Sequence, residues 1–228
     1  MHPQKKLSFQ RLIILILIAG SIWGLSEVAG NSLIKHFGLP LRAAILTGIA
    51  FTVMGFMGGY LKKAQYILLI LVPAILIVQM GVVLCGTPVA CKTNTCVALI
   101  LHAGFLSVLF HATGSGRKKT GAAKTFFLGS TAAFSSAIAF YFIGMRCAPC
   151  PYLLSFNSSA GFVSYLYAEA LPWTIFAGAG FSAGYSLGNR KSESPEFLSM
   201  NLKIPEFIQG LALSLGCWII SGLIIIGQ

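Results

Sequence analysis

The sequence carries little charge, and acidic residues are the scarcest of all. It has no aspartate and only five glutamates, against 16 lysines and arginines, and charged residues make up 9% of its 228 residues. A soluble domain is typically about 25% charged and needs those side chains to cover its surface. Hydrophobic residues reach 56%, and the mean hydropathy is +0.83. This composition excludes an ordinary soluble domain and indicates an integral membrane protein.

Alternation of apolar and polar residues with period two is also missing. A strand that faces lipid on one side and a lumen on the other needs that alternation, whereas the apolar stretches here are continuous. Within lipid, an α-helix satisfies its own backbone hydrogen bonds. We therefore predict an all-α, polytopic membrane helical bundle that forms a single integral membrane domain over residues 1–228.

The uncharged stretches between charged residues set the number of membrane spans. A helical crossing needs about 20 mostly apolar residues. The sequence predicts seven transmembrane helices, at about 12–34, 42–61, 65–85, 96–113, 125–146, 161–188 and 206–227. The first is long enough to span and is followed by no small-residue cleavage site, so we expect a retained helix and not a signal peptide. The chain should be a multi-pass protein of the cell (plasma or inner) membrane, in contact with the lipid bilayer.

The basic residues predict the orientation of the bundle. One set of connections, which includes the N-terminus, carries twelve of the 16 lysines and arginines. The opposite set carries only Lys35, Arg42, Lys92 and Arg146. Because cytoplasmic loops are enriched in basic residues, we expect the N-terminus in the cytoplasm and the C-terminus outside. The net charge of +11 then serves orientation and contact with anionic lipid, and we predict no nucleic-acid partner.

Two glutamates, Glu27 and Glu169, lie inside predicted spans. An ionisable group in the bilayer costs several kcal/mol and marks a functional site by default; the alternative is a protonated or paired carboxyl that holds helices together. Tyr165 and Trp173 lie four residues on either side of Glu169 and share its face. This pattern suits a polar or cationic organic ligand, although plain helix packing produces the same pattern. Pro172 should kink this helix, because its ring removes a backbone N–H donor and crowds the preceding turn.

The histidines do not predict a metal site. His102 and His111 lie nine residues apart in one span, which is 900° along a helix, so their rings point to opposite faces. His102 is a candidate for a polar site inside the bundle or a hydrogen-bonded structural histidine. We expect His111 at the membrane interface and His36 exposed in the first outer loop.

The cysteines gather on the side predicted to face outward, where disulfides persist. Around the second and third outer loops, at 86–95 and 147–160, lie Cys85, Cys91, Cys96, Cys147 and Cys150. Three interpretations stay open: structural disulfides, a redox site with a thiolate stabilised by Arg146, and capture of a soft metal by thiolates. The spacing is not the usual paired zinc pattern. Cys217, alone in the last span, fits a small apolar residue.

The layout resembles the S components of energy-coupling-factor transporters, which are hydrophobic proteins of about this length. Gly20 and Gly24 stand where that family carries a small-residue pair, while a seventh helix departs from its usual six. The resemblance implies a substrate-binding or translocating subunit for a vitamin- or metal-type solute, with outer loops 35–41, 86–95 and 147–160 capping the pocket. It also implies a membrane partner subunit and ATPase subunits.

The substrate site predicted for such a subunit consists of the polar and aromatic residues within the spans, namely Glu27, Glu169, His102, Tyr165 and Trp173. Transport needs a solute to exchange its hydration for fixed polar groups, and these are nearly the only candidates there. The chain contains no nucleotide-binding loop, so energy would come from partner proteins or an ion gradient. We predict no cofactor and favour a protein that is not an enzyme.

A second resemblance is to quinone-coupled disulfide enzymes of the DsbB and vitamin K epoxide reductase type. They carry a cysteine pair in one outer loop and a Cys-x-x-Cys at the end of a later helix, as Cys91/Cys96 and Cys147/Cys150 do here. If the chain is an enzyme, this implies a thiol-disulfide oxidoreductase that passes electrons from the first pair to the second and then to quinone. A third possibility is an accessory subunit of a membrane complex, in which the intramembrane glutamates are structural.

Overall fold

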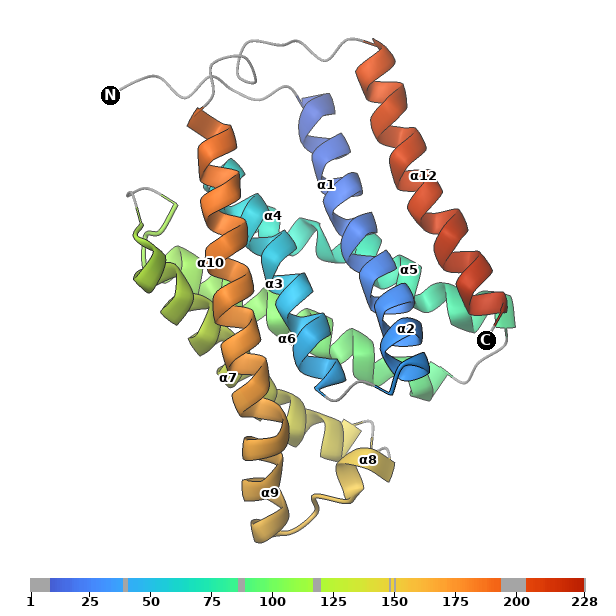
Figure 1. Cartoon of the computed structure of the whole chain (residues 1–228), viewed down its shortest axis with the longest axis vertical. Coiled ribbons are helices and arrows are strands. Elements are labelled where there is room, and N and C mark those ends of the chain that lie inside the picture. Colours follow the sequence, from blue (N-terminus) through green and yellow to red (C-terminus); the bar gives the residue numbers. More distant parts are fainter. Residues whose placement is uncertain are drawn as a thin grey trace.

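The computed structural model describes residues 9–38, 41–85, 89–116, 120–147, 149, 151–193 and 204–227, and these form helices without any strand (Figure 1). The prediction of an all-α bundle is confirmed. Two of the segments, η1 and η2, are π-helical. In chain order the elements are α1 (Phe9–Leu25), η1 (Ser26–Gly30), α2 (Asn31–His36), α3 (Arg42–Leu61), α4 (Ala64–Leu69), α5 (Leu71–Cys85), α6 (Val89–Ala112), α7 (Ala122–Cys147), α8 (Pro151–Leu154), α9 (Ser159–Tyr165), η2 (Leu166–Ala170), α10 (Leu171–Glu193) and α12 (Ile204–Ile226).

Six helices of the described chain are long and apolar enough to cross a membrane: Phe9–Ile34, Arg42–Leu61, Ala64–Leu84, Thr93–Ala112, Ala122–Cys147 and Glu206–Ile226. They make the chain a multi-pass membrane protein. The seventh predicted span exists as a helical run from α9 through α10, but it is not among these six. Its surface is rich in glycine, alanine and serine because α3 and α7 pack along it, so it needs less apolar side chain than a lipid-facing helix.

Part of the predicted second outer loop is helical. We expected a loop at 86–95 and a helix from 96, whereas α6 begins at Val89. The run Thr93-Asn94-Thr95 is typical of a loop by composition alone. In the structure Asn94 and Thr95 line a polar cavity, which accepts such side chains within a helix. The expected loop is therefore shorter, and the polar residues belong to the bundle.

A close helix contact joins α3 and α10 through glycines. A Cβ atom placed on Gly55 or Gly59 would lie well under 3.0 Å from a backbone oxygen of α10, and one on Gly184 would do the same to the Thr52 carbonyl of α3. Small residues at four-residue spacing allow this approach of two backbones in a membrane. The segment Gly-Ala-Gly-Phe-Ser-Ala-Gly at 178–184 is thus part of an internal interface, and its Gly178 lies against Ser130 of α7.

The helices α1, α5 and α12 form the other side of the bundle (Figure 1). Gly20 and Gly24 of α1 lie directly against α5. Toward α12, the hydroxyls of Ser21 and Ser214 are 2.7 Å apart, and the indole Nε1 of Trp218 donates to Ser21 Oγ at 3.0 Å. These hydrogen bonds between buried groups hold α12 on α1 where side-chain packing alone gives little preference for protein over lipid.

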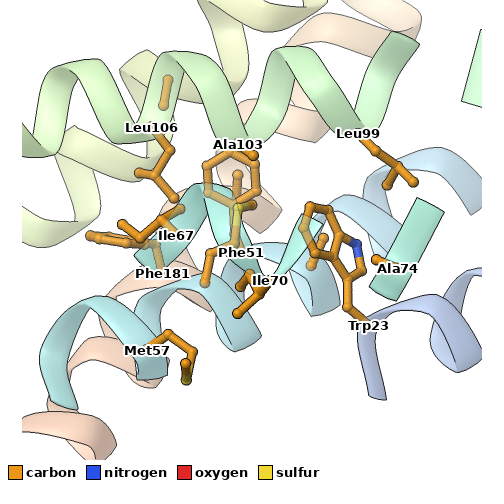
Figure 2. Packing of buried hydrophobic residues seen from close by; sticks show 14 of the residues in the cluster. Trp23, Phe51, Met57, Ile67, Ile70, Ala74, Leu99, Ala103, Leu106 and Phe181 are labelled. Carbon is orange, nitrogen blue, oxygen red and sulfur yellow. The ribbon is translucent and has the colours of Figure 1, made fainter. Parts of the chain in front are cut away.

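Between the two sides lies an apolar core. Figure 2 shows Trp23, Phe51, Leu99, Ala103 and Phe181 pointing into it from α1, α3, α6 and α10. Its largest side chains are fully buried. Close packing of this kind resists changes of volume. The middle of the bundle is therefore filled by apolar side chains.

The basic connections meet at one end of the bundle. Lys62, just after α3, donates through Nζ to Asn189 Oδ1 near the end of α10. The hydroxyl of Tyr185 donates to the Ser115 carbonyl after α6 at 2.9 Å, and Lys124 at the start of α7 donates to the Thr113 carbonyl at 3.4 Å. The structure thus gathers residues from different basic connections on one end, as the sequence predicts; that this end is cytoplasmic remains a prediction.

Replacing Gly184 by alanine should destabilise the bundle, because the added Cβ meets the Thr52 carbonyl, which cannot move independently of α3. Overpacking of this kind costs roughly 1–3 kcal/mol. We expect a lower midpoint of thermal unfolding in detergent, followed by size-exclusion chromatography. Gly104→Ala is the control, since no atom lies within 4 Å of the new methyl group there. Equal midpoints for the two variants would contradict the close contact.

Candidate binding cavity

A cavity of about 760 Å³ lies at the end of the bundle opposite the basic connections. It is formed where α3 and α10 begin, and where η1, α6 and the short helix α8 meet them. All five residues that the sequence singles out line it: Glu27, His102, Tyr165, Glu169 and Trp173. Ligand pockets commonly measure about 300–1,000 Å³. The structure therefore brings the candidates together, while their role in binding stays a prediction.

Both glutamates that the sequence places in predicted spans lie in π-helical segments, Glu27 in η1 and Glu169 in η2. In η2 the N–H of Leu171 bonds to the carbonyl of Leu166, five residues back. Pro172 follows and has no N–H to continue an α-helical pattern. The kink expected at Pro172 stays a prediction. Short π segments within α-helices occur frequently at functional sites.

The Glu169 carboxyl is held by two neutral donors. The hydroxyl of Tyr152 in α8 donates to Oε1, and the indole Nε1 of Trp173 donates to Oε2 at 3.2 Å. The expected shared face of Glu169 and Trp173 is confirmed by this contact. Tyr165 instead donates its hydroxyl to the Ala137 carbonyl at 3.0 Å, so its ring lines the cavity and its oxygen is tied to α7.

Glu27 lines the same cavity from the chain's first span. Arg42, the first residue of α3, is also in the lining and acts electrostatically on the Glu27 carboxyl. Trp23, one turn before Glu27, is fully buried, and its indole N–H interacts with this carboxyl only outside normal hydrogen-bond geometry. Glu27 thus shares the lining with a cation that acts on it, whereas the Glu169 carboxyl accepts its hydrogen bonds from neutral groups.

His102 is buried, at 4% exposure, yet neither ring nitrogen has a hydrogen-bond partner in the described structure. Its ring meets Phe51 and Trp173 edge to face, at centroid distances of 5.5 and 5.3 Å. Buried polar groups are almost always hydrogen-bonded, so a purely structural histidine does not fit this geometry. His111 is exposed on the opposite face of α6, and His36 is exposed at the end of α2, as expected.

Sequence reasoning missed several polar lining residues, among them Asn94 and Tyr152. Asn94 lies eight residues before His102 on the same side of α6, with Ala98 between them, and its Oδ1 is buried without a hydrogen-bond partner. Tyr152 was assigned to an outer loop and not to the site. Two signals were available in the sequence. Asn94 lies four residues before Ala98 and eight before His102, on one face of a helix, and Tyr152 follows shortly after the Cys-x-x-Cys.

The cysteine geometry does not support the redox arrangement. Cys91 and Cys96 both lie in α6, and not on either side of a loop. Five residues of α-helix rise about 7.5 Å, beyond the Cα separation of about 4.4–6.8 Å that a disulfide needs. The Cys96 thiol is buried and accepts a hydrogen bond from Gln79 Nε2 at 2.9 Å.

The remaining cysteine predictions are tested only in part. Within the described residues, Cys96, Cys147 and Cys217 carry thiols and not disulfides, and Cys217 is buried as expected of a small apolar residue. Cys150 lies outside the described residues, as do the side chains of Cys85 and Cys91. The part of the chain that is described contains no group of three or more His, Cys, Asp or Glu side chains suited to a metal ion.

No family model matches the chain, and neither a curated protein nor a solved structure is significantly similar to it. The fold and the cavity define the class at a coarse level: a polytopic α-helical membrane protein with a polar, aromatic-lined cavity near one end of its bundle.

Thiol labelling should distinguish the exposed cysteine from the buried ones and should also test the orientation. In variants with a single cysteine, we expect Cys147 to react with a membrane-impermeant maleimide on intact cells, because it is exposed at the cavity end. Cys96 should react only after denaturation. The variant Lys124→Cys, at the basic end, should be labelled only once the cells are opened. Labelling at positions 147 and 124 from the same side of the membrane would rule out the predicted topology.

Proposed function

We propose that the chain is the substrate-binding membrane subunit of a small-solute transporter, similar in role to the S components of energy-coupling-factor systems. The observation that carries this proposal is the convergence of two intramembrane carboxyls and an unpartnered buried histidine, Glu27, Glu169 and His102, on one cavity of about 760 Å³. A cavity of that size accommodates a vitamin-sized molecule together with some water.

The energetics of transport explain why such groups would be kept there. A polar solute that enters a low-dielectric site loses its hydrogen bonds to water. Only hydrogen bonds and charge interactions with fixed polar groups of the protein can compensate for that loss. Intramembrane ionisable residues are expensive and typically mark substrate or ion pathways. Short π segments within helices occur frequently at functional sites, and each of the two carboxyls lies in one, Glu27 in η1 and Glu169 in η2.

The energy source lies outside the chain under this proposal. The sequence has no nucleotide-binding loop, so we propose a membrane partner subunit with ATPase subunits, or an ion gradient, and a place in the plasma membrane. The glycines at four-residue spacing in α3 and α10 are already buried in the contact between these two helices. A partner would therefore dock on other surfaces of the bundle.

The two alternatives receive less support. A quinone-coupled oxidoreductase needs a reactive cysteine pair that can exchange electrons with a Cys-x-x-Cys, and the helical spacing of Cys91 and Cys96 does not suit that pair. An accessory subunit would need its buried carboxyls only for packing. It offers no reason for the His102 nitrogens and Asn94 Oδ1 to remain unpartnered in a cavity.

The proposal predicts that the gently purified protein retains a small molecule in its cavity. A mass spectrum of metabolites released from the wild-type chain, after incubation with a cell extract, should contain a species that is depleted at least tenfold in the double variant Glu27→Gln and Glu169→Gln. The reason is that charged hydrogen bonds contribute about 1.5–3 kcal/mol each.

The matched control is Glu206→Gln, which removes a carboxyl at the start of α12, away from the cavity lining. This variant should retain the same species as the wild type. Identical spectra for the wild type and the double variant would contradict the proposed function.

A further inference from the structure

We propose, building on the proposed function, that the cavity takes a monovalent organic cation with a flat, hydrogen-bonding ring. The charges that face the cavity are the starting point. Among the described lining residues, the formally charged side chains are Glu27, Glu169 and Arg42. Arg42 is the one cation among them, and its electrostatic action falls on Glu27. A carboxylate whose hydrogen bonds come from neutral donors attracts a cation and repels an anion, and the Glu169 carboxyl is of this kind.

The position of the cation follows from the contacts of the two carboxyls. Arg42 acts on Glu27. Both hydrogen bonds of the Glu169 carboxyl, from Tyr152 and Trp173, come from neutral donors. These donors fix the carboxylate, one on each oxygen, and leave further acceptor capacity on both. Glu169 is therefore the group that the ligand's cation meets.

The aromatic residues around Glu169 favour a cation that is part of a ring. Trp173 packs against Phe140 at a centroid distance of 5.9 Å and against His102 at 5.3 Å, and Tyr152 and Tyr165 line the same space. Aromatic faces attract organic cations through cation–π interaction, more strongly when water is excluded. They also stack with flat rings. A small hydrated metal cation would use neither property.

The unpartnered polar atoms supply the second, independent observation. His102 has no hydrogen-bond partner on either nitrogen and Asn94 has none on Oδ1, and both residues line the cavity from one side of α6. A neutral imidazole offers one donor and one acceptor. Ala98 lies between the two residues and leaves room above the helix backbone. The ligand's ring should thus carry both a donor and an acceptor along α6, with its positive charge toward Glu169.

A charge series on one ring tests this inference. The probes are 1-methylnicotinamide, nicotinamide and nicotinate, which share a substituted pyridine ring and carry charges of +1, 0 and −1 at neutral pH. Titration calorimetry on the full chain in lipid nanodiscs should give at least tenfold tighter binding of 1-methylnicotinamide than of nicotinamide, and the weakest binding for nicotinate.

Matched variants assign the preference to the site. Glu169→Gln should remove most of the advantage of the cation while it leaves the affinity for nicotinamide within about threefold, and Glu206→Gln should change neither. His102→Phe should weaken both probes, because it removes hydrogen bonds to the ring substituent, whereas His111→Phe on the exposed face of the same helix should not. Thermal midpoints close to that of the wild type show that each variant is folded, and Glu169→Ala replaces Glu169→Gln if the latter is not.

The outcomes separate this inference from the proposed function. Tighter binding of nicotinamide or nicotinate would overturn the inference about charge, and binding of none of the three probes at millimolar concentration would overturn it as well. The proposed function falls only if the retained-metabolite experiment also shows no dependence on Glu27 and Glu169. A cation preference that survives Glu169→Gln and Glu27→Gln would place the binding elsewhere and refute the site.

Discussion

The contact of α3 with α10 holds the two halves of the cavity wall in place. Their backbones approach so closely that Gly55, Gly59 and Gly184 have no room for a side chain. In lipid, where burying apolar surface gives helices little reason to associate, this approach and its dispersion contacts are a main source of cohesion. Because both helices begin at the cavity end, their fixed relative position sets Arg42 and Trp173 on its rim and wall. Binding geometry here depends on residues that never touch a ligand.

The cavity combines satisfied and unsatisfied polar groups in a way that suits a binding site. Tyr165 and Glu169 have partners within the protein, and these partners orient them. The His102 nitrogens and Asn94 Oδ1 do not, although an unpaired buried group costs about 1–3 kcal/mol. In a bundle that served only as a scaffold, such groups would lower the free energy of unfolding, and no bound ligand would compensate for that loss. A solute that supplies the missing partners recovers that free energy on binding.

The sequence predicts much of this architecture, and the reasons for its failures are local. Continuous apolar stretches identify the helices, because that signal depends on single helices, whereas the pairing of α3 with α10 could not be told from the glycines of either helix alone. The five candidate residues could be chosen because polar groups are so rare inside the spans. Asn94 was missed because Thr93-Asn94-Thr95 resembles a loop until the cavity beside α6 is known. Tyr152 was missed because only the fold brings α8 to Glu169, seventeen residues away in the chain.

The π segments have an evolutionary consequence. Their backbone bonds reach five residues back and not four, so each such segment holds one residue more than the α-helical turn that would replace it. Gain or loss of one codon can therefore switch a stretch of helix between an ordinary turn and a carboxyl-bearing bulge, with the rest of the span left in register with its neighbours.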